Sequence, residues 1–362
     1  MILQSGTAGK IFETIAISFF ISLLLVLPLT RFAIKVGLVD VPNSAPHKLH
    51  TRIIPISGGL TYAITLIITS LTILDRLGNQ LQSLLIAALL IFLFGLWDDF
   101  RPLSVQMKLV GQFAGAVLLF VLGVRVRVFD TLGLLLSLSP TIIYILNLLT
   151  TLLWLVFITN AYNLVDSMDG LMIGLSNIAL IFFLLASIDS HQISLALLCA
   201  AMLGAGVVIN FFNSSPGFIF MGDSGAQMIG FLLGAIAILY DPPERLQLST
   251  WFMPVLLLAV PIFDSVLVII SRLRKKQHIY SAGLDHTYHR LTHLGLSSVQ
   301  SVQLMQLTAI GLEILAFFAI SQDPLTANIM FLLIVILGIL AIILLESNIP
   351  WKIKIFSHNK ND

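Results

Sequence analysis

The sequence predicts an all-α integral membrane protein, a polytopic bundle of about eleven transmembrane helices. Hydrophobic residues make up 58% of the 362-residue chain and charged residues only 10%, whereas a typical soluble domain carries about 25% charged residues. The apolar residues also fall in repeated runs of roughly 17 to 25 residues, the length that crosses the hydrocarbon core of a bilayer. A soluble fold gives no reason for runs of that length along the whole chain.

The eleven spans are expected from windows of about 19 residues. They lie near residues 11–32, 56–75, 81–97, 107–125, 140–159, 171–188, 193–211, 225–240, 251–271, 303–321 and 325–345. The first run is too long for the apolar region of a signal peptide, which predicts a retained span. Because no polar segment is long enough for a separate soluble domain, residues 1–362 are expected to form one domain.

The distribution of lysine and arginine predicts which side the loops face, because basic residues near span ends are retained in the cytoplasm. With the C-terminus inside, the outer face keeps five of the 19 basic residues, which are Lys10, Arg76, Arg125, Arg127 and Arg245. A multi-pass protein of the inner (plasma) membrane is therefore expected, with most of its charged loops in the cytoplasm.

Arg125 and Arg127 occupy an alternating segment between valines, residues 124–128. Alternation of apolar and polar residues with a period of two is typical of a strand. The segment predicts a short outer β-hairpin, and its two charges run against the general charge preference.

The carboxylates of so apolar a chain are informative, because an ionisable group at membrane depth is costly and usually functional. Eight of the 18 acidic residues fall at or near the expected inner ends of spans, and these are Asp40, Asp98, Asp99, Asp166, Asp169, Asp223, Asp264 and Asp285. A transporter or lipid flippase, the rival class of function, predicts acids in mid-span or on both faces, and only Glu313 lies well inside an expected span. The concentration on one face favours an enzyme.

Adjacent carboxylates, Asp98 and Asp99, close the third expected span. They repel one another, and a site tolerates them where a divalent cation, a cationic side chain or a proton relieves the repulsion. Lys108 begins the next span and could meet a phosphate. The alternatives are a solvated helix end for the acidic pair and a snorkelling side chain for Lys108.

Four polar residues recur at intervals of three: Asn160, Asn163, Asp166 and Asp169, followed by Gly170. Residues at this spacing adjoin on a helix, but the row drifts around the axis, so the helix is expected to end or tighten near the glycine. Amides and carboxylates suit Mg²⁺ and the edges of a nucleobase or sugar. A polar seam between helices is the alternative.

A loop rich in proline and glycine, residues 213–225, begins at Asn213 and carries Phe220 and Asp223. Glycine on both sides of Asp223 lets the backbone approach a bound ion or phosphate closely. Asp223 is therefore the first choice for a metal ligand, with an ordinary loop carboxylate as the alternative.

Two inner loops combine basic residues with histidines, one around Lys48 and a larger one with His286, His289 and Arg290. A zinc site is not expected in the larger loop, because no cysteine accompanies the histidines and their spacing is not that of a closed structural site. Histidine with arginine predicts phosphate binding through charge-assisted hydrogen bonds. The neighbouring Arg-rich run, 272–276, is also what a cytoplasmic loop shows without any site.

The order of these elements resembles the polyprenyl-phosphate N-acetylhexosamine-1-phosphate transferase family (glycosyltransferase family 4). This family includes undecaprenyl-phosphate GlcNAc-1-phosphate transferases and phospho-MurNAc-pentapeptide translocase. The shared elements are Asp-x-Pro…His-Lys-x-His…Pro…Gly-Gly in residues 40–59, Trp-Asp-Asp at 97–99, Asn-Ala-x-Asn-Leu-x-Asp-x-x-Asp-Gly at 160–170, Phe-Met-Gly-Asp-Ser-Gly at 220–225 and Asp-His-x-x-His-Arg-Leu at 285–291. The resemblance covers about residues 30–295.

The resemblance implies roles for individual residues. Asp223 matches the Mg²⁺-binding aspartate and Asn163 a residue near the metal and pyrophosphate, while Asp98 and Asp99 match an acidic pair that acts as a base or positions the lipid phosphate. The predicted catalytic residues are thus Asp98, Asp99 and Asp223, and the predicted substrate-binding residues are Lys48, Lys108, Asn160, Asn163, Asp166, Asp169, Asn213, Phe220, His286, His289 and Arg290.

By the same resemblance, the chain is expected to be a Mg²⁺-dependent phosphotransferase, with Mn²⁺ as a substitute. It would move a sugar-1-phosphate, GlcNAc-1-phosphate first, from a UDP-sugar to polyprenyl phosphate at the cytoplasmic face, for cell-envelope polysaccharide synthesis. A homodimer is also implied, although no residue indicates its interface. The net charge of +1 provides no field that would attract nucleic acid.

Two departures from the family pattern concern the sugar. Tyr288 stands where many GlcNAc-1-phosphate transferases have a histidine, and the triple-histidine element of the MurNAc-pentapeptide enzymes is absent. These differences favour a simple N-acetylhexosamine, with phospho-MurNAc-pentapeptide transfer as the alternative reaction. A purely structural scaffold gives no reason for the ordered polar set.

Overall fold

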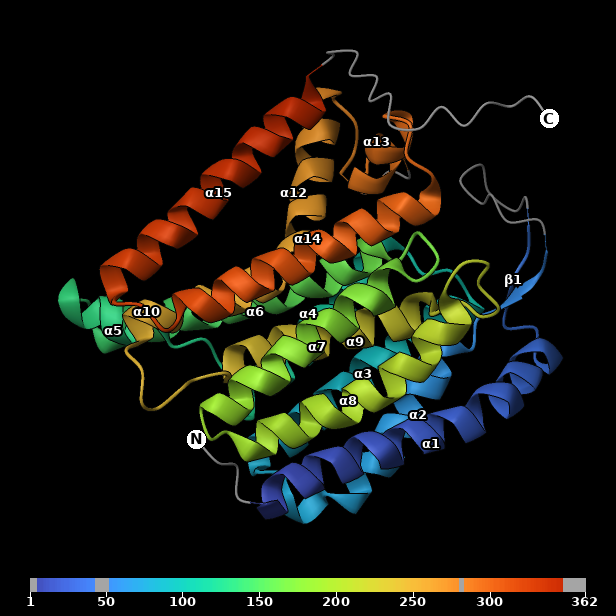
Figure 1. Ribbon diagram of the computed structural model, residues 1–362, viewed down its shortest axis with the longest axis horizontal. Coiled ribbons are helices and arrows are strands. Elements are labelled where there is room, and N and C mark those ends of the chain that lie inside the picture. Colours follow the sequence, from blue (N-terminus) through green and yellow to red (C-terminus); the bar gives the residue numbers. More distant parts are fainter. Residues whose placement is uncertain (1–4, 43–51, 280–282, 348–362) are drawn as a thin grey trace.

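The computed structural model describes residues 5–42, 52–279 and 283–347, and most of these residues are helical (Figure 1). The long helices are α1 (Ser5–Lys35), α3 (Asn79–Phe100), α6 (Pro140–Val165), α7 (Leu171–Asp189), α8 (Ile193–Asn213), α9 (Gly222–Leu239), α14 (Ser298–Ala319) and α15 (Pro324–Glu346). By length and composition these eight can cross a membrane. The all-α, multi-pass class expected from the sequence is confirmed.

The shorter elements complete the described chain. They are α2 (Gly58–Thr72), the 3₁₀ turn η1 (Leu74–Arg76), α4 (Val105–Val121), α5 (Val128–Leu135), α10 (Gln247–Thr250), α11 (Met253–Leu257), α12 (Ala259–Arg274), α13 (Thr287–His293) and the strands β1 (Val39–Asp40) and β2 (Ile54–Pro55). Each of the eleven expected spans coincides with a helix or a broken helix. However, α2 and α4 are only 15 and 17 residues long, which is short for a full crossing.

The ninth expected span is broken rather than straight. Residues Gln247–Leu257 and Ala259–Arg274 meet at an angle of 68°. Pro261 lies in the first turn of α12 and has no N–H to donate to the carbonyl of Leu257, so one hydrogen bond of a continuous helix is missing at this point and a bend is favoured. In Figure 1, α12 consequently runs across the direction of the central helices.

The predicted outer hairpin at 124–128 is wrong. Residues 124–127 form an irregular segment that leads into α5. The Val126 amide donates to Thr151 Oγ1 on α6 at 2.9 Å, so it binds a helix side chain instead of a strand partner. Within the described ranges, the paired strands are β1 and β2, antiparallel, with Val39 opposite Pro55.

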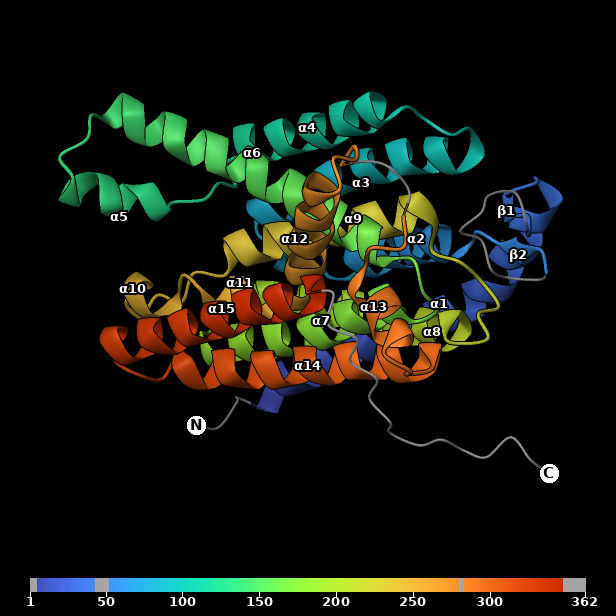
Figure 2. The same ribbon diagram turned by 90° about the horizontal axis from the view of Figure 1, so that it is seen from above.

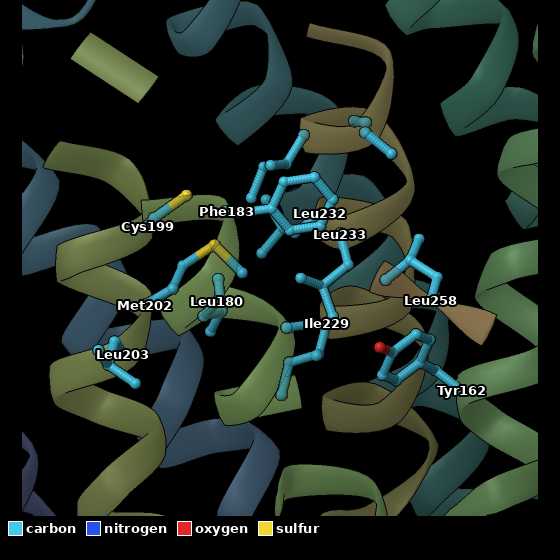
Figure 3. Close-up of a cluster of buried hydrophobic side chains, with 14 of the residues drawn as sticks. Tyr162, Leu180, Phe183, Cys199, Met202, Leu203, Ile229, Leu232, Leu233 and Leu258 are labelled. Atoms are coloured by element: carbon cyan, nitrogen blue, oxygen red, sulfur yellow. The ribbon is translucent and has the colours of Figure 1, made fainter. Parts of the chain in front are cut away.

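The core lies among α7, α8 and α9, whose facing side chains are large and apolar. Leu180, Phe183, Met202 and Ile229 have no exposed surface, and Figure 3 shows them pointing toward one another between the helices. In contrast, no residue in the apolar window of α15 is buried. The packed centre therefore fixes how the ends of α6 to α9 are placed.

The two ends of the bundle differ in what they carry. β1 lies at one end and α5 with α10 at the other in both views (Figures 1 and 2). The C-terminal ends of α3, α6 and α8 and the N-terminal ends of α4, α7 and α9 all belong to the β1 end. This arrangement brings the polar motifs of 97–108, 160–170 and 213–225 together.

Candidate functional site

The site is centred on two carboxylates and one lysine from three helices. Lys108 Nζ lies 2.5 Å from Asp98 Oδ2 and 2.5 Å from Asp223 Oδ2. Asp98 is in the last turn of α3, Lys108 in the first turn of α4 and Asp223 in the first turn of α9. Lys108 and Asp223, which are 115 positions apart in the sequence, thus share one charge centre.

The adjacent acid Asp99 has a different set of partners. Its two oxygens accept the backbone amides of Asp223 at 2.7 Å and Ser224 at 3.1 Å. These amides belong to the first turn of α9, where N–H groups have no partner within the helix, and a carboxylate is favourable there. Asp99 therefore caps and positions the helix that carries Asp223, while Asp98 faces Lys108.

Glycines allow this close approach of α3 and α9. A Cβ on Gly95 would lie 2.6 Å from Ser224 Cα, and a Cβ on Gly222 would lie 2.7 Å from Asp99 Oδ2. Gly222 also has φ +70°, a conformation that side chains other than glycine rarely adopt. Glycine at these two positions lets α3 and α9 contact each other through their backbones, whereas a larger side chain would separate the helices.

The end of α6 adds an amide and a further carboxylate. Asn163 Nδ2 donates to Asp223 Oδ1 at 2.6 Å. Asp166 follows the helix end, and burial together with the charges of Asp223, Asp99 and Asp169 raises its pKa to about 8. The carboxylates thus repel one another, so a bound cation would stabilise this end of the bundle.

The oxygen atoms fit a divalent cation such as Mg²⁺. In the three described ranges, no three His, Cys, Asp or Glu residues form a ready-made metal cluster. Mg²⁺ does not need one, because it usually binds one or two carboxylates while substrate phosphates and waters complete its shell. Asp223 and Asn163, with its amide turned to present Oδ1, supply such ligands beside Asp98.

The other predicted residues of 160–170 lie around this centre. Asn160 exchanges hydrogen bonds with Gln112, its Nδ2 donating to Gln112 Oε1 at 2.6 Å, and Gln112 in turn donates to Gln227 at 3.1 Å. Asp169 Oδ2 accepts the Gly217 amide at 2.9 Å. Asn160 therefore joins an amide network between α4, α6 and α9, and Asp169 holds the loop that leads to Asp223.

Asn213 and Phe220 also position this loop. The Asn213 side chain accepts the Gly170 amide at 3.1 Å and donates to the Ile219 carbonyl at 2.9 Å. Phe220 forms a parallel bridge with Ile56 next to β2. Lys48 lies outside the described residues.

The histidine loop forms a second group whose anchor the site prediction missed. His286 Nδ1 lies 2.8 Å from Asp264 Oδ2, and the Thr287 amide donates to Asp264 Oδ1 at 2.6 Å. Asp264 has no exposed surface and His286 is 6% exposed. Asp264 could be noticed in the sequence as an acidic residue at the inner end of an expected span. The sequence does not show that the break before α12 brings Asp264 next to the histidine loop.

The remaining loop residues connect the histidines to the rest of the bundle. The stacked ring of Tyr288 has a pKa raised to about 12, because burial outweighs its hydrogen bond with Ser167 of the 160–170 segment. Burial, with the neighbouring His286, lowers the pKa of His289 to about 4. His289 is therefore neutral near pH 7 and suited to hydrogen bonding more than to charge neutralisation.

Arg290, predicted to bind substrate, is directed to protein partners. It donates to the Leu345 carbonyl at 2.6 Å, to Ser271 Oγ at 3.0 Å and to Glu346 Oε1 at 2.5 Å. In this arrangement Arg290 ties the loop to the end of α15, and its substrate contact remains a prediction.

Comparison with known proteins places the central group in a region shared with a known family. Residues 81–241 match the model of Glycosyl transferase family 4. A protein of Bacillus subtilis (strain 168) named probable undecaprenyl-phosphate N-acetylglucosaminyl 1-phosphate transferase is 32% identical over 335 residues, which cover 90% of this chain and 91% of the relative. Proteins of Yersinia pestis and Escherichia coli (strain K12), both named undecaprenyl-phosphate alpha-N-acetylglucosaminyl 1-phosphate transferase, are 29% and 28% identical over 82% and 77% of this chain and 80% and 76% of their own lengths. The region that matches the family model contains Asp98, Lys108, Asn163 and Asp223, and the histidine loop lies beyond residue 241, where that match ends.

Proposed function

Because the chain belongs to glycosyl transferase family 4, we propose that it transfers GlcNAc-1-phosphate from UDP-GlcNAc to undecaprenyl phosphate and releases UMP. The relatives named for this sugar and acceptor match the chain over more than three quarters of its length. The observation that carries the proposal is Lys108 held between Asp98 and Asp223 at one end of apolar helices. A charge centre of this kind suits two phosphorylated substrates, one of them a lipid.

Members of this family generally require a metal ion, and when Mg²⁺ (or Mn²⁺) is bound it would draw charge from the donor pyrophosphate. Asp223 and Asn163 are the residues that would hold the ion. Their positions are set by the helix cap at Asp99 and by the loop contact of Asp169. The protein thus contributes mainly fixed placement of charge, which is what phosphoryl transfer needs.

The chemical step is a substitution at the β-phosphorus of the donor. An oxygen of the lipid phosphate forms the new bond, the bond from the β-phosphorus to the bridging oxygen breaks, and UMP leaves with that oxygen. A phosphate monoester is largely ionised at neutral pH (second pKa about 6), so no obligatory base is needed. Lys108 is placed to bind the lipid phosphate, and Asp98 to hold Lys108 in position.

The orientation of the protein is part of the same proposal. The chain is a multi-pass membrane protein, and the Asp223 site lies at one end of its helices. We place that end at the cytoplasmic face of the inner membrane, where a soluble UDP-sugar is available, and we expect homodimers from the family resemblance. The product, a polyprenyl diphosphate sugar, would serve cell-envelope polysaccharide synthesis.

The test is UMP release by the full-length protein in detergent with undecaprenyl phosphate and a panel of UDP-sugars. We expect release from UDP-GlcNAc that stops with EDTA and returns with Mg²⁺ or Mn²⁺. Asp223→Ala should lower the rate by at least about 10²-fold, whereas Asp75→Ala, an exposed acid in η1 at the other end, should leave it unchanged.

Release from a different donor would correct the sugar and keep the reaction. Absence of UMP with every donor, in protein shown to be folded, would contradict the transferase proposal. In that case a transporter or lipid flippase, which consumes no UDP-sugar, becomes the better explanation of the polar groups.

A further inference from the structure

A cavity of about 350 Å³ lies at the end of the bundle away from Asp223. Its wall is built from segment 123–128, the middle of α6 (Thr150 and Trp154), the end of α9 and helices α10 and α11. We propose that this cavity binds the phosphate headgroup of an anionic phospholipid in the outer leaflet. The proposal does not depend on the transferase reaction.

The cavity and the transferase site are on opposite membrane surfaces. Gln80, in the first turn of α3, lines the cavity, whereas Asp98 is in the last turn of the same helix. At 1.5 Å per residue the two positions are about 27 Å apart, close to the roughly 30 Å thickness of a hydrocarbon core. A ligand in the cavity therefore meets the leaflet opposite to the one that supplies the acceptor.

The positive charge of the cavity is not neutralised by protein. Arg125 and Arg127 line it, and within the described residues neither forms an ion pair with a carboxylate. Arg125 lies 5.9 Å above the ring of Tyr144, and nearby Asp130 is engaged with Asn147 at 2.7 Å. Of the residues that line the cavity, one is acidic, so its lining keeps a net positive charge.

The backbone of the same segment offers further donors. In the described chain the amides of Arg125 and Arg127 have no hydrogen-bond acceptor, while the intervening Val126 amide is taken by Thr151. Backbone amides next to guanidinium groups are a common setting for a phosphate oxygen. The segment therefore combines charge with unpaired donors.

The surroundings favour a lipid over a soluble anion. Apart from the arginines, the wall is mostly apolar, and Trp154, Tyr240 and Trp251 contribute aromatic rings. Tryptophan and tyrosine are enriched at the level of lipid headgroups, so a phosphate bound here would have glycerol and acyl groups beside apolar side chains. Basic residues on an outer surface also run against the usual charge bias, which a headgroup contact accounts for.

Native mass spectrometry of the full-length protein tests the proposal with phosphatidylglycerol as the probe. Phosphatidylglycerol should bind at least about tenfold more weakly to the double variant Arg125→Gln, Arg127→Gln, because charge-assisted hydrogen bonds are lost. Arg76→Gln is the matched control, since Arg76 is exposed at the same end and does not line the cavity. The pair Arg125→Lys, Arg127→Lys keeps the charge and should retain part of the binding.

Two further probes separate the sources of phosphate. Phosphatidylcholine and soluble glycerol 3-phosphate should bind much more weakly than phosphatidylglycerol. Equal phosphatidylglycerol binding by the native chain and the glutamine variant would overturn the proposal, and so would glycerol 3-phosphate binding as tightly as the lipid. Where the glutamine variant does not fold, the lysine variant provides the test. The proposal would be overturned if the lysine variant bound phosphatidylglycerol as well as the native chain does and showed no preference for phosphatidylglycerol over phosphatidylcholine.

UMP release by these variants is a separate readout. It should be unaffected, because the transferase site is about 27 Å away along α3. A failure of the proposed reaction would therefore leave the lipid measurement intact.

Discussion

Asp98 and Asp99 are neighbours in sequence, yet they contact different groups. Asp98 faces Lys108, whereas Asp99 accepts two backbone amides at the start of α9. Asp98→Asn should therefore reduce UMP release by at least about tenfold, because Lys108 loses one of its two charged partners. The thermal unfolding temperature should change little, since the Asn side chain can still accept the Leu103 amide that Asp98 binds at 2.6 Å.

Asp99→Asn should mainly lower the stability of the protein. An amide has a single acceptor oxygen, so one of the two backbone N–H groups of α9 loses its partner, at a cost of about 1–3 kcal/mol in the free energy of unfolding. Circular dichroism melts of both variants, with UMP release measured on the same samples, check the distinction. Equal loss of stability in the two variants would contradict the separate roles.

Asp264 is a buried carboxylate that acts through His286. Its two oxygens hold the His286 ring and the Thr287 amide, which fixes the orientation of the ring. We expect Asp264→Asn and His286→Gln each to slow UMP release, and the double variant to be no slower than the worse single one, because the two residues act as a unit.

The matched control is Asp285→Asn. That carboxylate is also in the loop, but it pairs with Lys275 and Arg272, and no hydrogen bond or ion pair of the described residues joins its side chain to His286. Burial alone would raise the pKa of Asp285, but these two cations hold it below its usual range. Additive losses for Asp264 and His286 in kinetic assays would show that they do not work together.

Site residues can be predicted from the sequence where they follow one another at a regular spacing within a single helix or loop. Asp98, Asp223 and Asn163 were predicted, and the structure brings them together. Asp98 and Asp99 have different partners because α9 begins next to Asp99, 124 residues later in the sequence. Arg290 is held by residues at the end of α15. Contacts of that range do not follow from local pattern.

At the scale of elements, the contact between α3 and α9 holds the site together. Gly95 permits it, because a Cβ there would lie 2.6 Å from Ser224 Cα, and backbone cannot move aside as a flexible side chain can. Gly95→Ala should push the two helices apart, lower the free energy of unfolding by about 1–3 kcal/mol and reduce UMP release by up to about 10²-fold through misplacement of Asp223.

Gly311→Ala is the matched control within another long helix. A Cβ at Gly311 would meet nothing within 4 Å, and alanine is the better helix former, so stability should be unchanged or slightly higher. Thermal melts and UMP release, measured for both variants, test whether α3 and α9 are in close contact at Gly95. A Gly95→Ala variant as active and stable as the native chain would mean that the helices are not in close contact.

The elements themselves were largely readable from hydrophobic runs. The runs located every long helix, because length and composition decide whether a segment can cross a bilayer. The alternating pattern at 124–128 predicted a strand incorrectly, because the Val126 amide binds the Thr151 side chain of α6 instead of a neighbouring strand. The bend before α12 is explained by Pro261, but its angle of 68° depends on packing that periodicity does not encode.

At the scale of the whole molecule, both proposals depend on the orientation of the chain in the membrane. The transferase proposal requires the Asp223 end to face the cytoplasm, and the lipid proposal requires the arginine cavity to face the outer leaflet. The charge bias predicted the end with Asp223 inside. The native chain offers a direct test, because its single cysteine, Cys199, has no exposed surface and should not react with a membrane-impermeant maleimide in intact cells.

New single cysteines can then report on each end. Glu244, between α9 and α10, and Arg101, directly after α3, are both exposed, and they lie at opposite ends of the bundle. Glu244→Cys should be labelled in intact cells, and Arg101→Cys only after permeabilisation, because a charged reagent does not cross the hydrocarbon core. The reverse pattern would place the Asp223 site outside, where a cytoplasmic UDP-sugar cannot reach it, and the transferase proposal would then fail together with the outer-leaflet assignment of the arginine cavity.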